Sequence, residues 1–179
     1  GADAFDPEAV ERLLDAKGRG RQMPPPVLVA KPATMRALAT GIPSYAEALA
    51  ERFWPGPLTL ICTEQTSLQW DLGETNGTVA LRMPDHPIAL ALLERTGPLA
   101  VSSANTTGSP AAVTAEEARQ MLGANVSVYL DAGEAPGRVA STILDCTGGH
   151  PEVLRLGALN IEVLNEVLQP LGLPLADGR

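Results

Sequence analysis

The sequence has few of the residues that carry redox, metal and aromatic-stacking chemistry. Its 179 residues include two cysteines, two histidines and only 3% aromatic residues. Cys62 and Cys146 each lie in an apolar run typical of a strand, which favours small buried side chains over a disulfide or a metal site. We therefore expect neither a disulfide framework nor redox chemistry.

Long apolar runs and the common nucleotide-binding glycine patterns are also absent. No run approaches the roughly 20 residues that span a bilayer, and no charged-then-apolar leader opens the chain. Neither GxxxxGK(S/T) nor GxGxxG occurs in the sequence. These absences predict a soluble, cytoplasmic protein with no membrane partner, in which any nucleotide site is built from scattered residues.

Positive charge is scarce as well. Thirteen lysines and arginines stand against 21 acidic residues, for a net charge of −8. This balance argues against a surface devoted to nonspecific nucleic-acid binding, so an anion must bind in a local pocket. Three of the thirteen basic residues fall in the run Lys17-Gly18-Arg19-Gly20-Arg21. Taken alone, such a run is more often a solvated charge cluster than a site.

The apolar residues are arranged as alternating helices and strands. With 45% apolar residues, the chain is long enough to form one domain with a substantial core. The alternation predicts an α/β domain with a twisted, mixed sheet flanked by helices. We expect seven strands, at residues 27–30, 58–63, 78–81, 99–102, 126–130, 142–145 and 153–156.

Capping residues mark the helices. Asp6 before Pro7 predicts a helix that ends near Gly18, just ahead of the cationic residues. Other helix starts are expected at Ser44 with Glu47, at Thr114 with Glu117, and at Asn160.

Polar groups stand at the ends of several expected strands. The run Ser102-Ser103-Ala104-Asn105 follows one, Arg82 ends another, Ser141 opens a third and Arg155 closes the last. Each has an ordinary explanation, such as shaping a turn or, for Arg82, pairing with Asp85. Together they suit a phosphate, a carboxylate or a ribose. Arginine can donate two parallel hydrogen bonds to an oxyanion, and a hydroxyl group forms short directional hydrogen bonds. Convergent loops of this kind commonly form a ligand pocket.

Six segments occur in an order typical of one family: KGR at 17–19, FWPGPLTL at 53–60, TVALRMPDHP at 78–87, SSANTTGSPA at 102–111, STILD at 141–145 and VLRLGA at 153–158. The chain resembles the short bacterial form of the YrdC-like L-threonylcarbamoyladenylate synthases. The resemblance implies a nucleotidyltransferase that forms threonylcarbamoyl-AMP and pyrophosphate from L-threonine, bicarbonate and ATP. Its product would serve the threonylcarbamoyladenosine modification of tRNA beside the anticodon.

The same resemblance implies roles for eight residues. Those expected to bind ATP are Lys17, Arg19, Thr78, Asn105 and Arg155, with Lys17 and Arg19 also catalytic. Those expected to bind threonine are Arg82, Ser103 and Ser141. Mg²⁺ is expected with the triphosphate, although no acidic ligand pair stands out and no metal-ligating residue is predicted.

Two departures from the family pattern bear on these expectations. Relatives usually carry a strand reading like PTDTVYG before the first helix, so the domain at 1–179 is expected to lack that strand. Leu28 stands where many relatives have a histidine that contacts threonine.

The resemblance also suggests partners and leaves alternatives. It implies contact with RNA or tRNA, and transfer of the product to tRNA threonylcarbamoyl-transfer proteins. One alternative is a noncatalytic RNA-binding protein of the same fold, although the acidic composition weighs against it. Another is a carbamoyl-adenylate-forming relative, which would ordinarily belong to a much longer chain.

Overall fold

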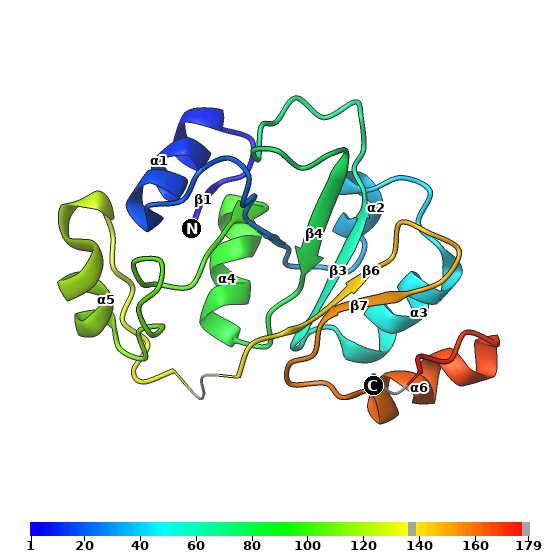
Figure 1. Ribbon diagram of the computed structural model, residues 1–179. Helices are drawn as coiled ribbons and strands as arrows, with labels where there is room; N and C mark the ends of the chain where they lie inside the picture. Colours follow the sequence, from blue (N-terminus) through cyan, green and yellow to red (C-terminus); the bar gives the residue numbers. More distant parts are fainter. Residues whose placement is uncertain (136–138, 177–179) are drawn as a thin grey trace.

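A seven-stranded sheet forms the centre of the protein, which a computed structural model describes over residues 1–135 and 139–176 (Figure 1). The strand order is β1-β5-β2-β4-β3-β6-β7. Strand β2 runs parallel to β4 and β3 parallel to β6, while the other neighbours are antiparallel, so the expected mixed sheet is confirmed. The strands are β1 (Ala2–Asp3), β2 (Val27–Leu28), β3 (Leu58–Thr63), β4 (Thr78–Arg82), β5 (Leu99–Ala100), β6 (Thr142–Asp145) and β7 (Glu152–Arg155).

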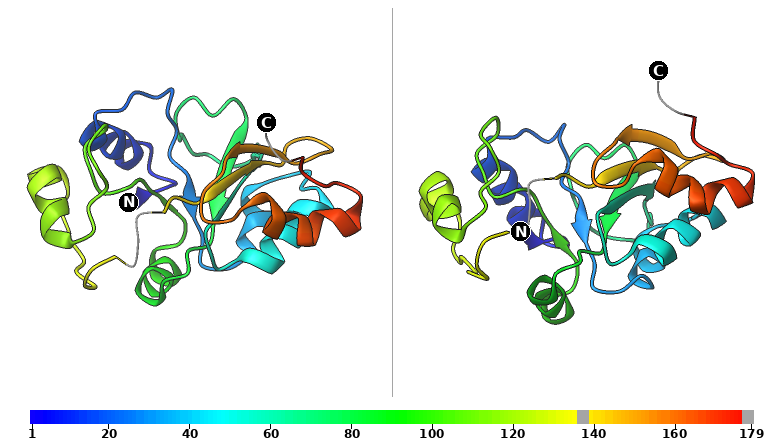
Figure 2. Two further views of the ribbon diagram at one scale, coloured as in Figure 1. Left: turned by 60° about the horizontal axis from the view of Figure 1, so that its bottom comes forward. Right: turned by 90° about the horizontal axis from the view of Figure 1, so that it is seen from below.

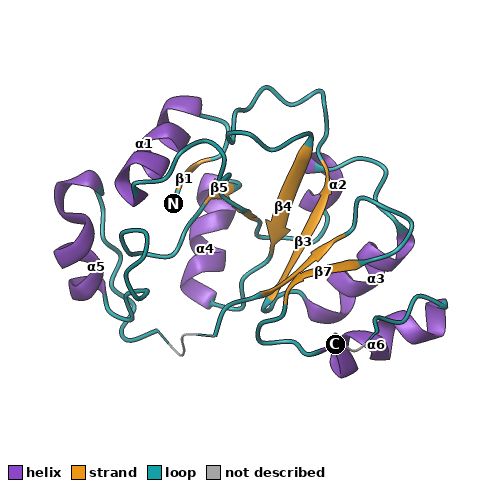
Figure 3. Ribbon diagram, in the orientation of Figure 1, coloured by secondary structure: helices purple, strands orange, loops and turns teal. Residues whose placement is uncertain are grey.

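Six α-helices and two short 3₁₀ helices in the described ranges surround this sheet. They are α1 (Pro7–Lys17), α2 (Thr34–Leu38), α3 (Ser44–Phe53), α4 (Pro87–Thr96), α5 (Ala115–Leu122), α6 (Ile161–Leu168), η1 (Gly123–Asn125) and η2 (Gln169–Leu171). Long loops join β3 to β4 and β5 to α5 (Figure 3). None of the helices within residues 1–135 and 139–176 has both the length and the apolarity needed to cross a membrane.

One expected strand is wrong. Residues 126–130 pair with no strand in the described part of the chain. Val128 and Leu130 are 70% and 60% exposed, and Tyr129 instead donates a hydrogen bond from its hydroxyl to the carbonyl of Gly123. The apolar pattern is present, but no neighbouring backbone is available to complete a ladder. The other six expected strands are present, and β1, which was not expected, pairs with β5.

The two faces of the sheet have different environments. In β3, Leu58, Leu60 and Cys62 are fully buried in the core that α3 and α6 also enter. These two helices lie side by side on one face of the sheet (Figure 2). Because side chains alternate along a strand, Thr59 and Ile61 point to the opposite face. That face is where ligand-binding groups can gather.

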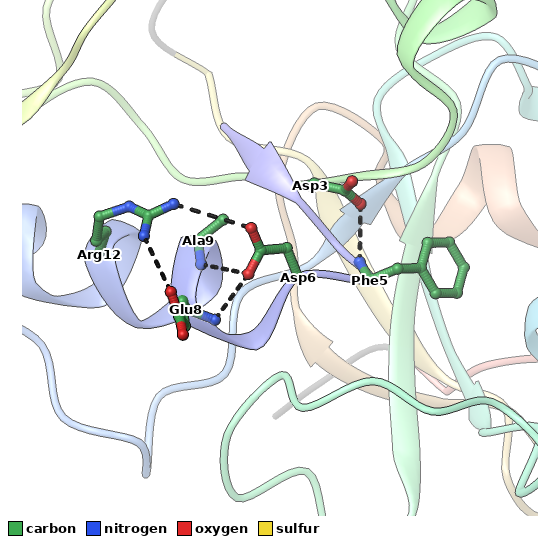
Figure 4. A network of polar contacts seen from close by, with 6 residues as sticks. All are labelled: Asp3, Phe5, Asp6, Glu8, Ala9 and Arg12. Carbon is green, nitrogen blue, oxygen red and sulfur yellow. Dashed lines mark hydrogen bonds and ion pairs between the residues drawn. The ribbon is translucent and has the colours of Figure 1, made fainter.

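The start of α1 is fixed by the predicted cap. Figure 4 shows the Asp6 carboxylate accepting hydrogen bonds from the backbone N–H groups of Glu8 and Ala9, at 3.0 and 3.1 Å. Arg12 lies one turn on, 3.9 Å from the Asp6 carboxylate and 4.0 Å from that of Glu8. The helix ends at Gly18, whose φ of 63° is favourable for glycine. These two caps fix the ends of α1, whose last residue is Lys17.

The other caps were predicted with mixed success. Thr114 and Asn160 accept from the N–H groups three residues ahead, which confirms the starts of α5 and α6. The capping box at Ser44 is wrong, because Pro43 occupies the capping position. The Glu47 carboxylate instead accepts from Arg36 at 2.8 Å.

The two thiols should be inert in the folded protein. Cys62 and Cys146 are 0% and 1% exposed, and burial raises the pKa of Cys62 to about 12 and that of Cys146 well above its usual range. Since the thiolate is the reactive form, we expect no labelling by a disulfide reagent such as Ellman's at pH 8 and two labelled thiols after denaturation. Rapid labelling of the native chain would contradict this burial.

Candidate active site

A cavity of about 850 Å³ lies over the open face of the sheet. Alternate residues of the central strands form its floor, and loops form its walls. Three arginines line it, Arg19, Arg82 and Arg155, and no described lining residue is an aspartate or glutamate. In a chain with a net charge of −8, such a cavity is suited to anionic ligands.

The register of the sheet brings distant residues into one row across this floor. Leu28 of β2 lies opposite Arg82 of β4, and Thr59 of β3 lies opposite Ile143 of β6. Ile143 in turn lies opposite Arg155 of β7. The strands therefore place two guanidinium groups and a hydroxyl on the same face from three separate parts of the sequence.

A register shift gives Arg155 its direction. Between the pairs Leu144–Val153 and Ile143–Arg155, strand β7 contains one more residue than β6. Val153 therefore contacts the core, whereas Arg155 lines the cavity, although an unbroken strand would place both on one face. Bulges next to active sites commonly redirect a side chain in this way.

Arg82 is a partly buried cation without a carboxylate partner. Its Nε donates to the carbonyl of Gly56 at 3.0 Å, and it forms no ion pair with Asp85 or any other residue in the described ranges. Burial, followed by the nearby charge of Arg155, lowers the pKa of Arg82. Because an arginine remains charged at neutral pH, this site favours a bound anion.

Ser141 lies at the centre of a hydroxyl and guanidinium network. Its side chain is buried, and its Oγ lies 2.9 Å from Oγ1 of Thr59. Arg155 donates to the Ser141 carbonyl at 3.0 and 2.9 Å and to its Oγ at 3.1 Å. A Cβ on Gly157 would lie 2.2 Å from the carbonyl oxygen of Ala140, so glycine is required beside this network. The network fixes Ser141 and Arg155 relative to each other.

Lys17 supports the turn that begins the 102–111 loop. It is 3% exposed, and its Nζ donates to the Ser103 carbonyl at 2.5 Å, to Asn105 Oδ1 at 2.6 Å and to the Asn105 carbonyl. The Asn105 amide in turn donates to the Ser109 carbonyl at 2.6 Å. Burial, followed by the charge of Arg19, lowers the pKa of Lys17. The three ammonium protons are thus matched to three oxygens of the turn.

Six of the eight predicted site residues line the cavity: Arg19, Thr78, Arg82, Ser103, Ser141 and Arg155. Lys17 and Asn105 are not among the described residues that line the cavity, and both bond to Ser103, which does line it. Arg19 donates to Oγ1 of Thr107 at 3.3 Å and enters no ion pair in the described part of the chain.

Sequence reasoning missed other cavity residues. Thr59 is the clearest, and its signal was a hydroxyl within the apolar run at 58–62, on the face opposite Leu58 and Leu60. Thr75, Leu72 and the Pro24–Pro26 run also line the cavity, but they come from loops without a regular pattern. Leu28 lies on the floor of the cavity, so an apolar side chain stands where many relatives are expected to have histidine.

Comparison with known proteins places the chain in a family. Residues 1–157 match the Sua5/YciO/YrdC family, which carries the description "Telomere recombination". A Mycobacterium tuberculosis H37Rv protein provisionally named threonylcarbamoyl-AMP synthase is 54% identical over 168 residues, which cover 94% of this chain and 77% of that protein. The chain belongs to the Sua5/YciO/YrdC family, as the six sequence segments predicted.

More distant relatives extend the comparison to a solved structure. The Bacillus subtilis protein named threonylcarbamoyl-AMP synthase is 37% identical over 173 residues, covering 96% of this chain and 50% of that protein. The crystal structure of Pyrococcus abyssi Sua5 complexed with L-threonine superposes with a TM-score of 0.88 at 38% identity. It covers 94% of this chain, which spans about half the length of that archaeal protein.

Proposed function

We propose that the protein is an L-threonylcarbamoyladenylate synthase. The observation that carries the proposal is the cavity with three arginines and no described carboxylate, in a chain similar to proteins named for this activity. A solved relative at 38% identity binds L-threonine, which supports threonine as a substrate here. The alternative of a carbamoyl-adenylate-forming enzyme has no such support among the relatives described above.

The reaction needs positioning and charge stabilisation more than a nucleophilic side chain. The amine of threonine and bicarbonate form a carbamate and release water. A carbamate oxygen then bonds to the α-phosphorus of ATP while the bond to the bridging oxygen breaks and pyrophosphate leaves. The carboxylate, the carbamate and the phosphates all carry negative charge. Preorganised cations are therefore expected to contribute most to stabilising the transition state.

The cavity residues suit distinct parts of this chemistry. Arg82, partly buried and without a counterion among the described residues, is matched to the threonine carboxylate, and the Ser141 hydroxyl lines the same cavity. Arg19 and Arg155 are matched to the phosphates, and Thr78 to the nucleotide. The apolar lining that includes Leu28 and Leu72 provides the surface that excludes water.

Lys17 and Asn105 act in this proposal through the turn that they hold. The three protons of the Lys17 ammonium are engaged by oxygens of the turn, and Asn105 accepts from Lys17 and Ser103 while it donates to the Ser109 carbonyl. The Ser103 side chain of this turn lines the cavity. Both residues therefore position the threonine-binding hydroxyl of Ser103, and the Lys17 ammonium does not contact the phosphates directly.

We expect Mg²⁺ to bind together with ATP. No cluster of three histidine, cysteine, aspartate or glutamate side chains suited to a metal occurs within residues 1–135 and 139–176. This fits a metal held mainly by phosphate oxygens and water, as Mg²⁺ commonly is, and its contribution would be neutralisation of phosphate charge.

The product defines the cellular role that we propose. Threonylcarbamoyl-AMP is a mixed anhydride that hydrolyses readily, so it should pass in the cytoplasm to proteins that transfer threonylcarbamoyl to tRNA. The target would be the adenosine beside the anticodon. The shortage of positive charge favours this handover over a large tRNA-binding surface on this chain.

The test is pyrophosphate release from ATP with Mg²⁺ and bicarbonate, with and without L-threonine. We expect release that depends on both threonine and bicarbonate and continues over many turnovers. Salt-sensitive RNA binding without such turnover would contradict the proposal and favour the noncatalytic RNA-binding alternative.

A further inference from the structure

The cationic run at 17–21 contains three basic side chains with three different environments. Lys17 is bonded to the 103–105 turn, and Arg19 lines the cavity. Arg21 does neither, because its guanidinium turns to the loop between β3 and β4. The synthase chemistry leaves this third side chain without a role.

Arg21 and Asp71 join two loops that are far apart in sequence. Nη2 of Arg21 lies 2.7 and 2.9 Å from the two carboxylate oxygens of Asp71. The Arg21 carbonyl accepts from the backbone N–H of Glu74 at 2.8 Å, so the contact includes backbone as well as side chain. We name these contacts, together with Gly73, the clasp.

Gly73 makes the backbone part of the clasp possible. Its φ is +102°, and a Cβ there would lie 2.6 Å from the Arg21 carbonyl oxygen. Its N–H donates to the Asp71 carboxylate at 3.0 Å. The close approach of the two loops thus requires glycine at this position.

Each loop that the clasp joins forms part of the cavity wall. Arg19 and the Pro24–Pro26 run come from the loop after α1, while Leu72 and Thr75 come from the loop before β4. Arg19 is two residues from one side of the clasp, and Leu72 is one residue from the other. The contact between Arg21 and Asp71 thus joins the two loops close to residues that line the cavity.

We propose that the clasp is a positioning device for ATP, in which Arg21 and Asp71 hold Arg19 and the facing wall at the separation that nucleotide binding needs. This inference rests on the proposed function, because it takes Arg19 as a phosphate ligand. Threonine binding should be affected little, since Arg82 is held in the ladder between β2 and β4 and Ser141 directly precedes β6.

The test compares charge reversal with its repair. Asp71→Arg places two like charges in contact and should weaken ATP binding about tenfold. Asp71→Asn should weaken it only two- to threefold, roughly what an exposed ion pair contributes. The double variant Arg21→Asp with Asp71→Arg restores opposite charges and should recover most of the affinity. Calorimetric titration with ATP and, separately, with L-threonine provides the dissociation constants.

The matched control is Glu47→Arg, which reverses the exposed Arg36–Glu47 pair, 2.8 Å long, whose residues do not line the cavity. Its ATP affinity should equal that of the wild type. Arg19→Ala supplies the positive control for lost ATP affinity. Thermal melting of each variant verifies that it is folded.

Three outcomes separate the clasp from the activity. The clasp is supported if Asp71→Arg weakens ATP binding, leaves threonine binding nearly unchanged, and the double variant recovers the ATP affinity. If the wild type binds ATP in this way but releases no pyrophosphate, only the synthase proposal fails. Unchanged ATP affinity in folded Asp71→Arg, or equal losses for both substrates, overturns the clasp and leaves the synthase intact. A wild type that binds no ATP overturns both.

Discussion

Replacing Arg82 by alanine is expected to raise the KM for L-threonine about 30-fold, because hydrogen bonds to a charged group contribute about 2 kcal/mol. The KM for ATP should change much less. Arg82 is half-buried, bonds the Gly56 carbonyl through Nε alone, and forms no ion pair among the described residues. Steady-state pyrophosphate release at varied threonine and saturating ATP measures the effect.

Two further variants sharpen this result. Arg82→Lys keeps the charge but loses the planar fork, so its threonine KM should lie between those of the wild type and the alanine variant. Arg95→Ala removes an exposed arginine from the last turn of α4 and should leave both KM values unchanged. A normal threonine KM in folded Arg82→Ala would contradict the assignment of the carboxylate to Arg82.

Replacing Lys17 by methionine is expected to destabilise the protein by about 3 kcal/mol, because it leaves buried oxygens of the 103–105 turn without a donor. For a chain of this size, that loss corresponds to a fall in Tm of about 6–12 °C. The kcat should fall as well, since Ser103 loses its fixed position. Thermal melting and pyrophosphate release measure the two effects.

The matched comparison is Arg19→Met, two residues along the same run. Arg19 is half-buried and lines the cavity, so this variant should keep its Tm within a few degrees and raise the KM for ATP. The opposite result for Lys17→Met, with an unchanged Tm and only the KM for ATP raised, would show that Lys17 holds phosphate directly, as the sequence resemblance implies.

Local features of the fold were predictable from the sequence. Asp6 identified the start of α1, Gly18 identified its end, and the apolar runs identified the strands that contain Thr59 and Arg82. These features depend on residues within a few positions of each other. Strand ends also identified most of the cavity-lining polar groups, because neighbouring strand ends meet at one place in a sheet.

Long-range features were not predictable in the same way. The direction of Lys17 depends on a turn 86 residues further along the chain. Arg155 faces the cavity because of a bulge that only the pairing with β6 reveals. Residues 126–130 have the pattern of a strand but pair with no strand among the residues that the structure describes. In each case the outcome is decided by a segment that the local pattern does not include.

The most direct test of the central claim is the fate of labelled bicarbonate. The chain is incubated with ATP, Mg²⁺, L-threonine and [¹⁴C]bicarbonate, and the adenylate product and pyrophosphate are quantified together. The account predicts one labelled threonylcarbamoyl-AMP for each pyrophosphate released, and no label without threonine. Pyrophosphate release that leaves bicarbonate unincorporated, or no adenylate at all from the folded wild-type chain, would contradict it.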